Sequence, residues 1–225
     1  MILGIDTSIG TAVALVDPAG GILAEIVSPD PRGHAEVIGD LLDRAFAAAG
    51  VGPADVTAVA AGMGPGPFTG LRVGIAAARA FALGRGIPVV AVASHDAAAR
   101  ALADPAFAVA ANAADSAPVV EGQPLAVVTD ARRREVAVSV YRVESGEPVR
   151  IVDPHLVLRA STDPVELFGA PASELAETTS ISAAALARIA AERLASGTAV
   201  TDAAEPLYLR APDVTISAGP KKVGT

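Results

Sequence analysis

The sequence predicts an α/β fold built as two lobes, on three observations. Apolar runs typical of buried strands alternate with helical patterns through the first hundred residues. A unit made of a strand that ends in Asp and a following hairpin occurs twice, in residues 2–26 and 125–152, which places Asp6 and Asp130 at matching positions. The chain has 225 residues, of which 52% are hydrophobic, so it has the material for a sizeable core. Because Asp also favours turns, the repeated unit is consistent with two lobes made by duplication and also with two strands that end in Asp by coincidence.

The first lobe is expected over residues 1–104. A strand over 2–6 is followed by a hairpin whose arms, 11–17 and 22–27, meet at a Pro/Gly turn. A helix over 34–49 is predicted from apolar residues at helical spacing and is ended by Gly50. Strands over 56–62 and 87–94 alternate with helices over 71–84, ended by Gly84 and Gly86, and 95–103.

A smaller or degenerate second lobe is expected over residues 105–225. Residues 104–124 are rich in Ala, Pro and small polar residues, which is typical of a linker or a poorly packed crossover. A strand over 125–130 and a hairpin that turns at 144–147 come next. The last predicted helix covers 181–197, with Ser180 or Ser182 as its cap, and residues 215–225 are expected to fray.

Composition limits the classes of function. The net charge of −8 is a poor match for a phosphate backbone, and the single basic run, 131–135, is either a solvated turn or a binding patch. Without cysteine the chain has no disulfide and no thiolate nucleophile. No stretch offers about 18 strongly apolar residues, and the start has no basic region typical of a signal peptide, so we expect a cytoplasmic protein without membrane contact.

The glycine-rich stretch 62–74, GMGPGPFTGLRVG, fits neither common phosphate-binding motif. It lacks the Gly-Lys pair of a P-loop and the third glycine of a dinucleotide fingerprint, and Pro65 and Pro67 each remove a backbone donor. The helix after it carries very small residues at every fourth position, which allow another backbone to approach closely: Gly70, Gly74, Ala78 and Ala82. From the residues alone, packing on the chain's own sheet is favoured over a partner helix.

Several segments together resemble the TsaB (YeaZ) family of bacterial tRNA-modification proteins. They are ILGIDTS, HAEVIGDLLDRAFAAAG, GMGPGPFTGLRVGIAAARAFALGRGIPVVAVAS, DARRREVAVSVY and EPLYLR, in this order, from Met1 to about Arg210. The glycine-rich core is the most specific of them, although Pro67 stands where the family usually has Ser. The resemblance implies an actin-like, Hsp70-like ATPase (ribonuclease H-like) fold with two lobes, each a mixed sheet with flanking helices.

The resemblance also implies a non-catalytic subunit that pairs with a TsaD-like paralogue, the enzyme that transfers a threonylcarbamoyl group to adenosine 37 of tRNA. It implies a homodimer when the chain is alone, a TsaE-like small ATPase in a larger complex, and only indirect contact with tRNA. No cofactor is expected to bind tightly here, and ATP and a metal are expected on the partner. In the family the interface lies on the first two helices. The resemblance therefore assigns the small-residue stripe to contact with a partner helix instead of packing on the chain's own sheet. On this sequence the interface residues would be His34, Ile38, Leu41, Leu42, Ala45, Gly70, Arg72, Val73, Gly74, Ala77, Ala78 and Phe81.

Catalysis by this chain itself has little support. The catalytic paralogue holds a metal with a His-x-x-x-His pair, and in this chain Ser94 and Ala98 stand at those two places. His95 is present, but no second His follows it four residues later. Asp96 is either a lone metal ligand or an acidic residue at the N-terminus of a helix. Neither H-E-x-x-H nor G-x-S-x-G occurs. The candidate residues of a vestigial nucleotide cleft are Asp6, Thr7, Ser8, Asp130 and Arg132. The alternatives are an actin-fold ATPase or small-molecule kinase with its own Mg-ATP site, and a homodimeric binding module.

Overall fold

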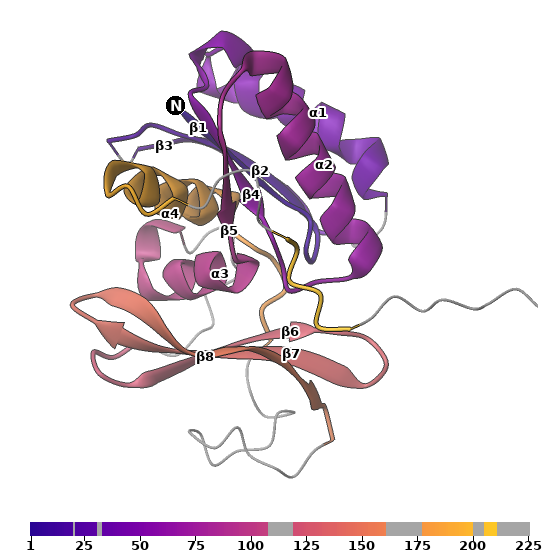
Figure 1. Cartoon of the computed structure of the whole chain (residues 1–225), viewed down its shortest axis with the longest axis vertical. Helices are drawn as coiled ribbons and strands as arrows, with labels where there is room; N and C mark the ends of the chain where they lie inside the picture. The colour runs from indigo at the N-terminus through magenta and orange to yellow at the C-terminus, as the bar shows by residue number, and fades with distance from the viewer. Residues whose placement is uncertain (20, 31–32, 108–118, 161–176, 200–204, 211–225) are drawn as a thin grey trace, which may run out of the picture.

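The computed structural model describes residues 1–19, 21–30, 33–107, 119–160, 177–199 and 205–210. It has two β-sheets and four α-helices in these residues (Figure 1), which confirms the α/β class. The first sheet has the order β3-β2-β1-β4-β5 and is mixed, because β1 pairs antiparallel with β2 and parallel with β4. Its strands are β1 (Ile2–Asp6), β2 (Thr11–Val16), β3 (Ile22–Ser28), β4 (Ala58–Gly62) and β5 (Val89–Val92).

Helices cover both faces of the first sheet, and side chains alternate between two cores. Leu3, Ile5 and Val13 point toward α1 (His34–Ala49) and α2 (Phe68–Arg85). Ile2 and Ala14, one residue away along their strands, point instead toward α3 (Ser94–Ala103) and α4 (Ala183–Ala195). This period of two explains why the strands read as continuous apolar runs in the sequence.

The predicted helix ends are mostly confirmed. Gly50 follows α1 with φ 67°, in the left-handed conformation that glycine adopts at low cost. Gly86 does the same for α2 with φ 64°, whereas Gly84 lies inside that helix and does not end it. Short 3-10 helices at Pro53–Asp55 and Pro105–Phe107 complete the helical elements of the described residues, none of which is long and apolar enough to cross a membrane.

The second sheet has the order β6-β7-β8 and is antiparallel, with strands Pro124–Asp130, Glu135–Glu144 and Glu147–Leu158. The hairpin turns at Ser145 and Gly146, as expected. The expectation that this second sheet is mixed is not met in the residues that the structure describes: its three strands pair antiparallel, and the parallel pairing seen beside them is one bridge from Val128 to Glu177. The expected linker falls partly outside the described residues, at 108–118, and the expected frayed tail falls wholly outside them.

Helix α4 packs on the first sheet, although it follows the lobe boundary expected at residues 104 and 105. Figure 1 shows it on the face opposite α1 and α2, with α3 between the two sheets. The close approach depends on Gly4, since a Cβ at this position would overlap the carbonyl oxygen of Ala183. The boundary at 104/105 therefore separates the two sheets but not the helices that cover them.

The N-terminus of α4 is held by the predicted cap and by one residue from the first sheet. Ser182 Oγ accepts a hydrogen bond from the Ala185 amide at 3.0 Å, which confirms Ser182 as the cap. Glu25 on β3 accepts hydrogen bonds from Ser182 Oγ and from the Ala184 amide, both at 3.1 Å. Burial raises the pKa of Glu25, and these hydrogen bonds act in the opposite direction.

Replacing Glu25 tests whether this contact fixes α4 on the sheet. Glu25→Ala leaves the Ala184 amide without its acceptor, so we expect a loss of about 1–3 kcal/mol in the free energy of unfolding. Chemical denaturation followed by circular dichroism measures it. Asp43→Ala, at an exposed position of α1, is the control and should unfold like the unchanged protein. An equal stability of the Glu25 variant would show that α4 is held by its apolar face alone.

Candidate functional site around the glycine-rich loop

Strand β1 ends at Asp6, whose carboxylate is completely enclosed. Its Oδ1 accepts hydrogen bonds from the Ser8 amide at 2.8 Å and from Ser8 Oγ at 2.6 Å, and its Oδ2 accepts one from Ser94 Oγ at 2.5 Å. Only 2% of Asp6 is exposed. Burial raises the pKa of Asp6, while the hydrogen bonds from Ser8 and Ser94 lower it. The carboxylate is thus used inside the fold.

The glycine-rich loop lies directly on this turn. Ser94 Oγ accepts a hydrogen bond from the Gly64 amide at 3.0 Å, and the Ser94 amide donates to the Gly64 carbonyl at 2.7 Å. A Cβ at Gly62 would overlap the Asp6 carboxylate, and one at Gly66 would lie 2.7 Å from the Ser8 carbonyl oxygen. Gly62 and Gly66 are therefore explained by close packing on residues 6–8, without any phosphate.

Thr7 connects the same turn to α2. Its hydroxyl donates to the Gly70 carbonyl at 2.7 Å and accepts from the Gly74 amide at 3.0 Å. These two groups are four residues apart, the spacing of a helical hydrogen bond, so Thr7 bridges one step of the helical ladder. His34, which is hydrogen-bonded to Thr11 through Nδ1 at 2.8 Å, packs beside Gly70.

These contacts correct part of the predicted partner interface. The small-residue stripe faces the chain's own sheet, as the residues alone had favoured, because Gly74 packs on Thr7 and Ala78 and Ala82 lie in the core under α1 and α2. Six members of the predicted set are buried within the chain's own fold: His34, Leu41, Ala45, Gly70, Gly74 and Ala78. The members that keep exposed surface are Ile38, Leu42, Arg72, Val73, Ala77 and Phe81.

Two of the five residues predicted for the nucleotide cleft line a cavity, and three do not. The cavity of about 450 Å³ lies between the glycine-rich loop, the turn after β6 and residues 208–210, with Asp130 and Arg132 on its wall. Asp6, Thr7 and Ser8 are at most 2% exposed and are covered by the loop. The structure therefore does not bring the two aspartates of the expected cleft to one cavity, since Asp130 is exposed and Asp6 is buried.

The sequence did not predict the aromatic cluster of Phe68 and Tyr208, which forms part of the lining of this cavity. The Arg72 guanidinium lies 3.8 Å from the centre of the Phe68 ring and donates a hydrogen bond to Tyr208 Oη at 3.1 Å. The Phe68 and Tyr208 rings are 4.9 Å apart. The Leu207 amide also donates to the Met63 carbonyl at 2.7 Å, so residues 207 and 208 are attached to both ends of the loop. Because residues 207 and 208 lie far from the loop along the chain, sequence patterns did not predict this contact.

Helix α3 connects the two sheets through polar side chains. His95 is fully buried, with Nδ1 2.7 Å from Ser139 Oγ and Nε2 3.0 Å from Thr129 Oγ1. Burial, together with the positive charge of Arg150, lowers the pKa of His95 to about 3. The ring is therefore neutral at physiological pH and has a structural role.

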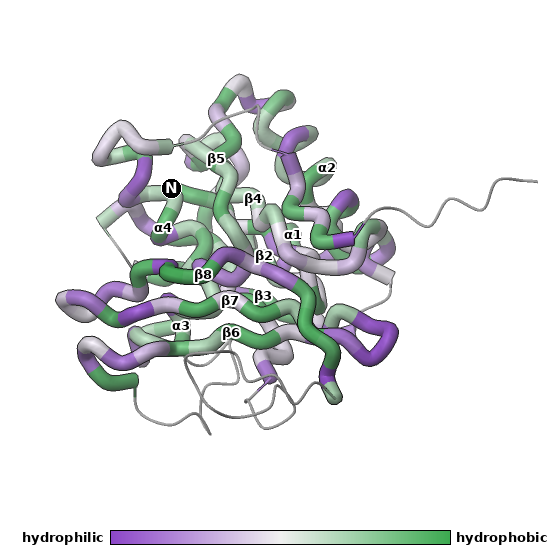
Figure 2. The backbone as a smooth tube through the Cα atoms, turned by 60° about the horizontal axis from the view of Figure 1, so that its bottom comes forward, coloured by the Kyte–Doolittle hydropathy of each residue, from purple (hydrophilic) through white to green (hydrophobic). Residues whose placement is uncertain are grey.

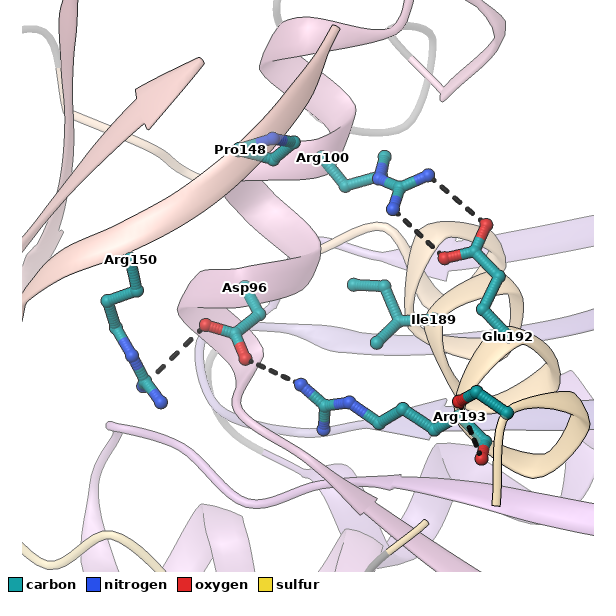
Figure 3. Close-up of a pocket in the computed structure, with 8 residues that line it drawn as sticks. Asp96, Arg100, Pro148, Arg150, Ile189, Glu192 and Arg193 are labelled. Carbon is teal, nitrogen blue, oxygen red and sulfur yellow. Dashed lines mark hydrogen bonds and ion pairs between the residues drawn. The ribbon is translucent and has the colours of Figure 1, made fainter. Parts of the chain in front are cut away.

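Asp96, in the first turn of α3, is the centre of an ion-pair network. It accepts a hydrogen bond from Tyr141 Oη at 3.0 Å and forms ion pairs with Arg193 at 3.0 Å and Arg150 at 3.6 Å. Figure 3 shows Asp96, Arg150 and Arg193 around a polar cavity of about 480 Å³ between α3, α4 and β8, where Arg100 also pairs with Glu192. In the described part of the chain, no group of three or more His, Asp or Glu residues is placed to hold a metal ion.

Gly74→Leu tests the position of the stripe. If a partner helix packed against the stripe, as the family resemblance implies, this variant would fold normally and fail to associate. In the structure the new side chain overlaps Thr7, so we expect the free energy of unfolding to fall by about 3 kcal/mol or more. Thermal unfolding followed by circular dichroism measures the loss. Ala76→Leu, exposed on the same helix, is the matched control and should melt normally.

The buried His95 predicts a specific dependence of stability on pH. The folded state keeps the imidazole neutral down to about pH 3, whereas the unfolded chain binds a proton near pH 6.5. Above pH 6.5 the protonation of His95 does not lower the free energy of unfolding. As the pH falls from 6.5 toward 3 the free energy of unfolding decreases, by about 2 kcal/mol between pH 6.5 and 5. Urea unfolding of the protein and of His95→Gln across this range checks it. The difference in slope isolates His95, and parallel curves would contradict the assignment.

Comparison with known proteins identifies the family. The model of a family described as TsaD, tRNA N6-adenosine threonylcarbamoyltransferase, matches residues 5–204. YeaZ from Pseudomonas aeruginosa is 26% identical with a TM-score of 0.70, over 92% of this chain and 99% of that chain. A second structure, of an uncharacterized protein described as similar to peptidase YEAZ from Pseudomonas aeruginosa, is 26% identical with a TM-score of 0.70, over 93% and 99% of the two chains. No curated protein matches.

These similarities cover almost the whole length of both chains, and they confirm the expected actin-like, ribonuclease H-like fold. The chain therefore belongs to the TsaD family of tRNA N6-adenosine threonylcarbamoyltransferases, within which it is of the TsaB (YeaZ) kind.

Proposed function

We propose that this chain is a non-catalytic subunit that pairs with a TsaD-like enzyme and supports threonylcarbamoyl transfer to adenosine 37 of tRNA. The observation that supports the proposal is that polar side chains at the centre of the fold are hydrogen-bonded to other groups of the same chain. Asp6, Ser94 and His95 are buried, and their side chains form hydrogen bonds within the chain. A reacting group would have to break these bonds to reach a substrate.

The positions that matter most for metal chemistry support the same conclusion. Ser94 and Ala98, which stand at the places of the catalytic paralogue's His pair, are fully buried. Hydroxyl and methyl groups do not replace two imidazole ligands, and a catalytic metal usually needs several protein ligands. We therefore place ATP and the metal on the partner, and we assign tRNA contact to the partner because this chain has a net charge of −8.

The exposed side of α2 is the surface that we assign to the partner. Ala76, Ala80 and Leu83 lie on one face at helical spacing, and Leu83 is 85% exposed. The alanines allow a second helix to approach closely, and Leu83 supplies an apolar contact. We assign the partner to this surface instead of to the buried small-residue stripe. The surface extends to Val73 and Ala77, two residues of the predicted interface that keep exposed surface. When no enzyme is present, the same surface would support a homodimer.

The partner assignment is tested by size-exclusion chromatography with light scattering, on this protein alone and mixed with a TsaD homologue from the same cell. We expect a heterodimer that replaces any homodimer. Ala76→Glu should melt normally and fail to pair, because it places a charge at a helix contact. Ala195→Glu, the same change at an exposed position of α4, is the control and should pair. In cells that lack the native protein, only the control should restore threonylcarbamoyladenosine in tRNA, measured by mass spectrometry.

Two other outcomes would favour the alternative functions. Saturable binding of Mg-ATP to the isolated chain in calorimetry, with phosphate release, would support an actin-fold ATPase or small-molecule kinase. A homodimer that persists when the TsaD homologue is in excess would support a homodimeric binding module. The same experiment with a TsaE homologue added would test the larger complex.

A further inference from the structure

We propose that the cavity between the glycine-rich loop and the turn after β6 is a docking site for an acidic peptide segment of another protein, with one apolar side chain as its anchor. The cavity has a volume of about 450 Å³, which is in the range of ligand-binding pockets. It is separate from the α2 surface that we assign to the TsaD-like enzyme, and the proposal does not depend on that pairing.

Part of the cavity lining is apolar. Ala137 on β7 and Leu156 on β8 line it, together with Pro65, Pro67 and Leu209. The apolar surface continues outside the cavity, because Leu158 lies two residues beyond Leu156, on the same side of β8, and is 60% exposed. Figure 2 shows this hydrophobic end of β8 beside the hydrophilic turn between β6 and β7. A surface that extends beyond the cavity suits a chain segment better than a small molecule.

The rim of the cavity is positively charged in an acidic protein. Arg132, Arg133 and Arg210 line it, and the acid among the lining residues, Asp130, is already paired with Arg159 at 3.2 Å. Arg210 is paired with Glu135, whereas the Arg132 guanidinium has no hydrogen bond or ion pair within the described residues. With a net charge of −8 on the whole chain, this rim attracts carboxylates that the rest of the surface repels.

A phosphate group fits the cavity less well than carboxylates held by arginine side chains. Phosphate sites use free backbone amides, and here Pro65 and Pro67 have none. The Ala131 amide donates to the Glu135 carbonyl and the Arg132 amide donates to Asp130, so these two amides of the opposite turn are already occupied. The Phe68 ring, which could stack on a base, is already covered by Arg72 and Tyr208. These observations favour a peptide over a nucleotide.

Selection of short random peptides displayed on phage, with the full-length protein immobilised, tests the proposal. We expect enrichment of peptides with one aromatic or aliphatic residue flanked by Asp or Glu. The most enriched peptide, labelled with fluorescein, should bind in anisotropy titrations and weaken as salt is added. Arg132→Glu should weaken binding by about tenfold or more, because it reverses the charge at the rim. Leu156→Asp, in the apolar lining, should do the same.

The matched control is Arg142→Glu, which makes the same charge change at an exposed position of β7 that does not line the cavity. It should bind the peptide normally, and all variants are to be compared with the unchanged protein by thermal melting. The proposal is overturned if no acidic motif is enriched, or if the enriched peptide binds Arg132→Glu as well as it binds the unchanged protein. Displacement of the peptide by AMP or Mg-ATP at equal concentration would assign the cavity to a nucleotide instead.

Discussion

The arrangement of the first lobe depends on one buried carboxylate. Asp6 stands at the end of β1, where burial without partners would disfavour its charged form strongly. Ser8 and Ser94 provide the hydrogen bonds that compensate, and Ser94 in turn holds the Gly64 amide. The end of β1, the glycine-rich loop and the start of α3 are therefore fixed relative to one another by a single group of side chains. A loop with larger residues at positions 62 or 66 would not fit over them.

This arrangement determines where interactions with other molecules are available. Thr7 binds the first turns of α2 and holds the buried side of that helix on β1, so α2 presents its other side to the surroundings. The loop that covers Asp6 forms, with its outer side, one wall of the cavity lined by Arg132. The polar side chains at the centre of the fold are occupied by hydrogen bonds within the chain. The exposed side of α2 and the cavity beside Arg132 are the two surfaces that we propose for binding other chains.

The sequence predicted what depends on neighbouring residues. The hairpins, the ends of α1 and α2, the cap at Ser182 and the lack of a phosphate motif in the loop all follow from local spacing and from turn and cap chemistry. It did not predict that α4 crosses back to the first sheet, because contact between Gly4 and Ala183 joins residues far apart in the chain. Helical spacing showed that Gly70, Gly74 and Ala78 share a face, but spacing alone does not say what lies against that face.

The two strand–Asp–hairpin units show most clearly why local pattern does not determine a site. Asp6 and Asp130 follow similar strands, yet Asp6 is buried while Asp130 is exposed and paired with Arg159. The difference comes from what lies above each turn. The glycine-rich loop covers the first, and the second is open to the cavity, with Arg132, Arg133 and Arg134 at φ of 61°, 54° and 65°. The two turns therefore do not meet in one cavity, although their strands end in the same residue type. The open turn after β6 is the one that we propose for peptide binding.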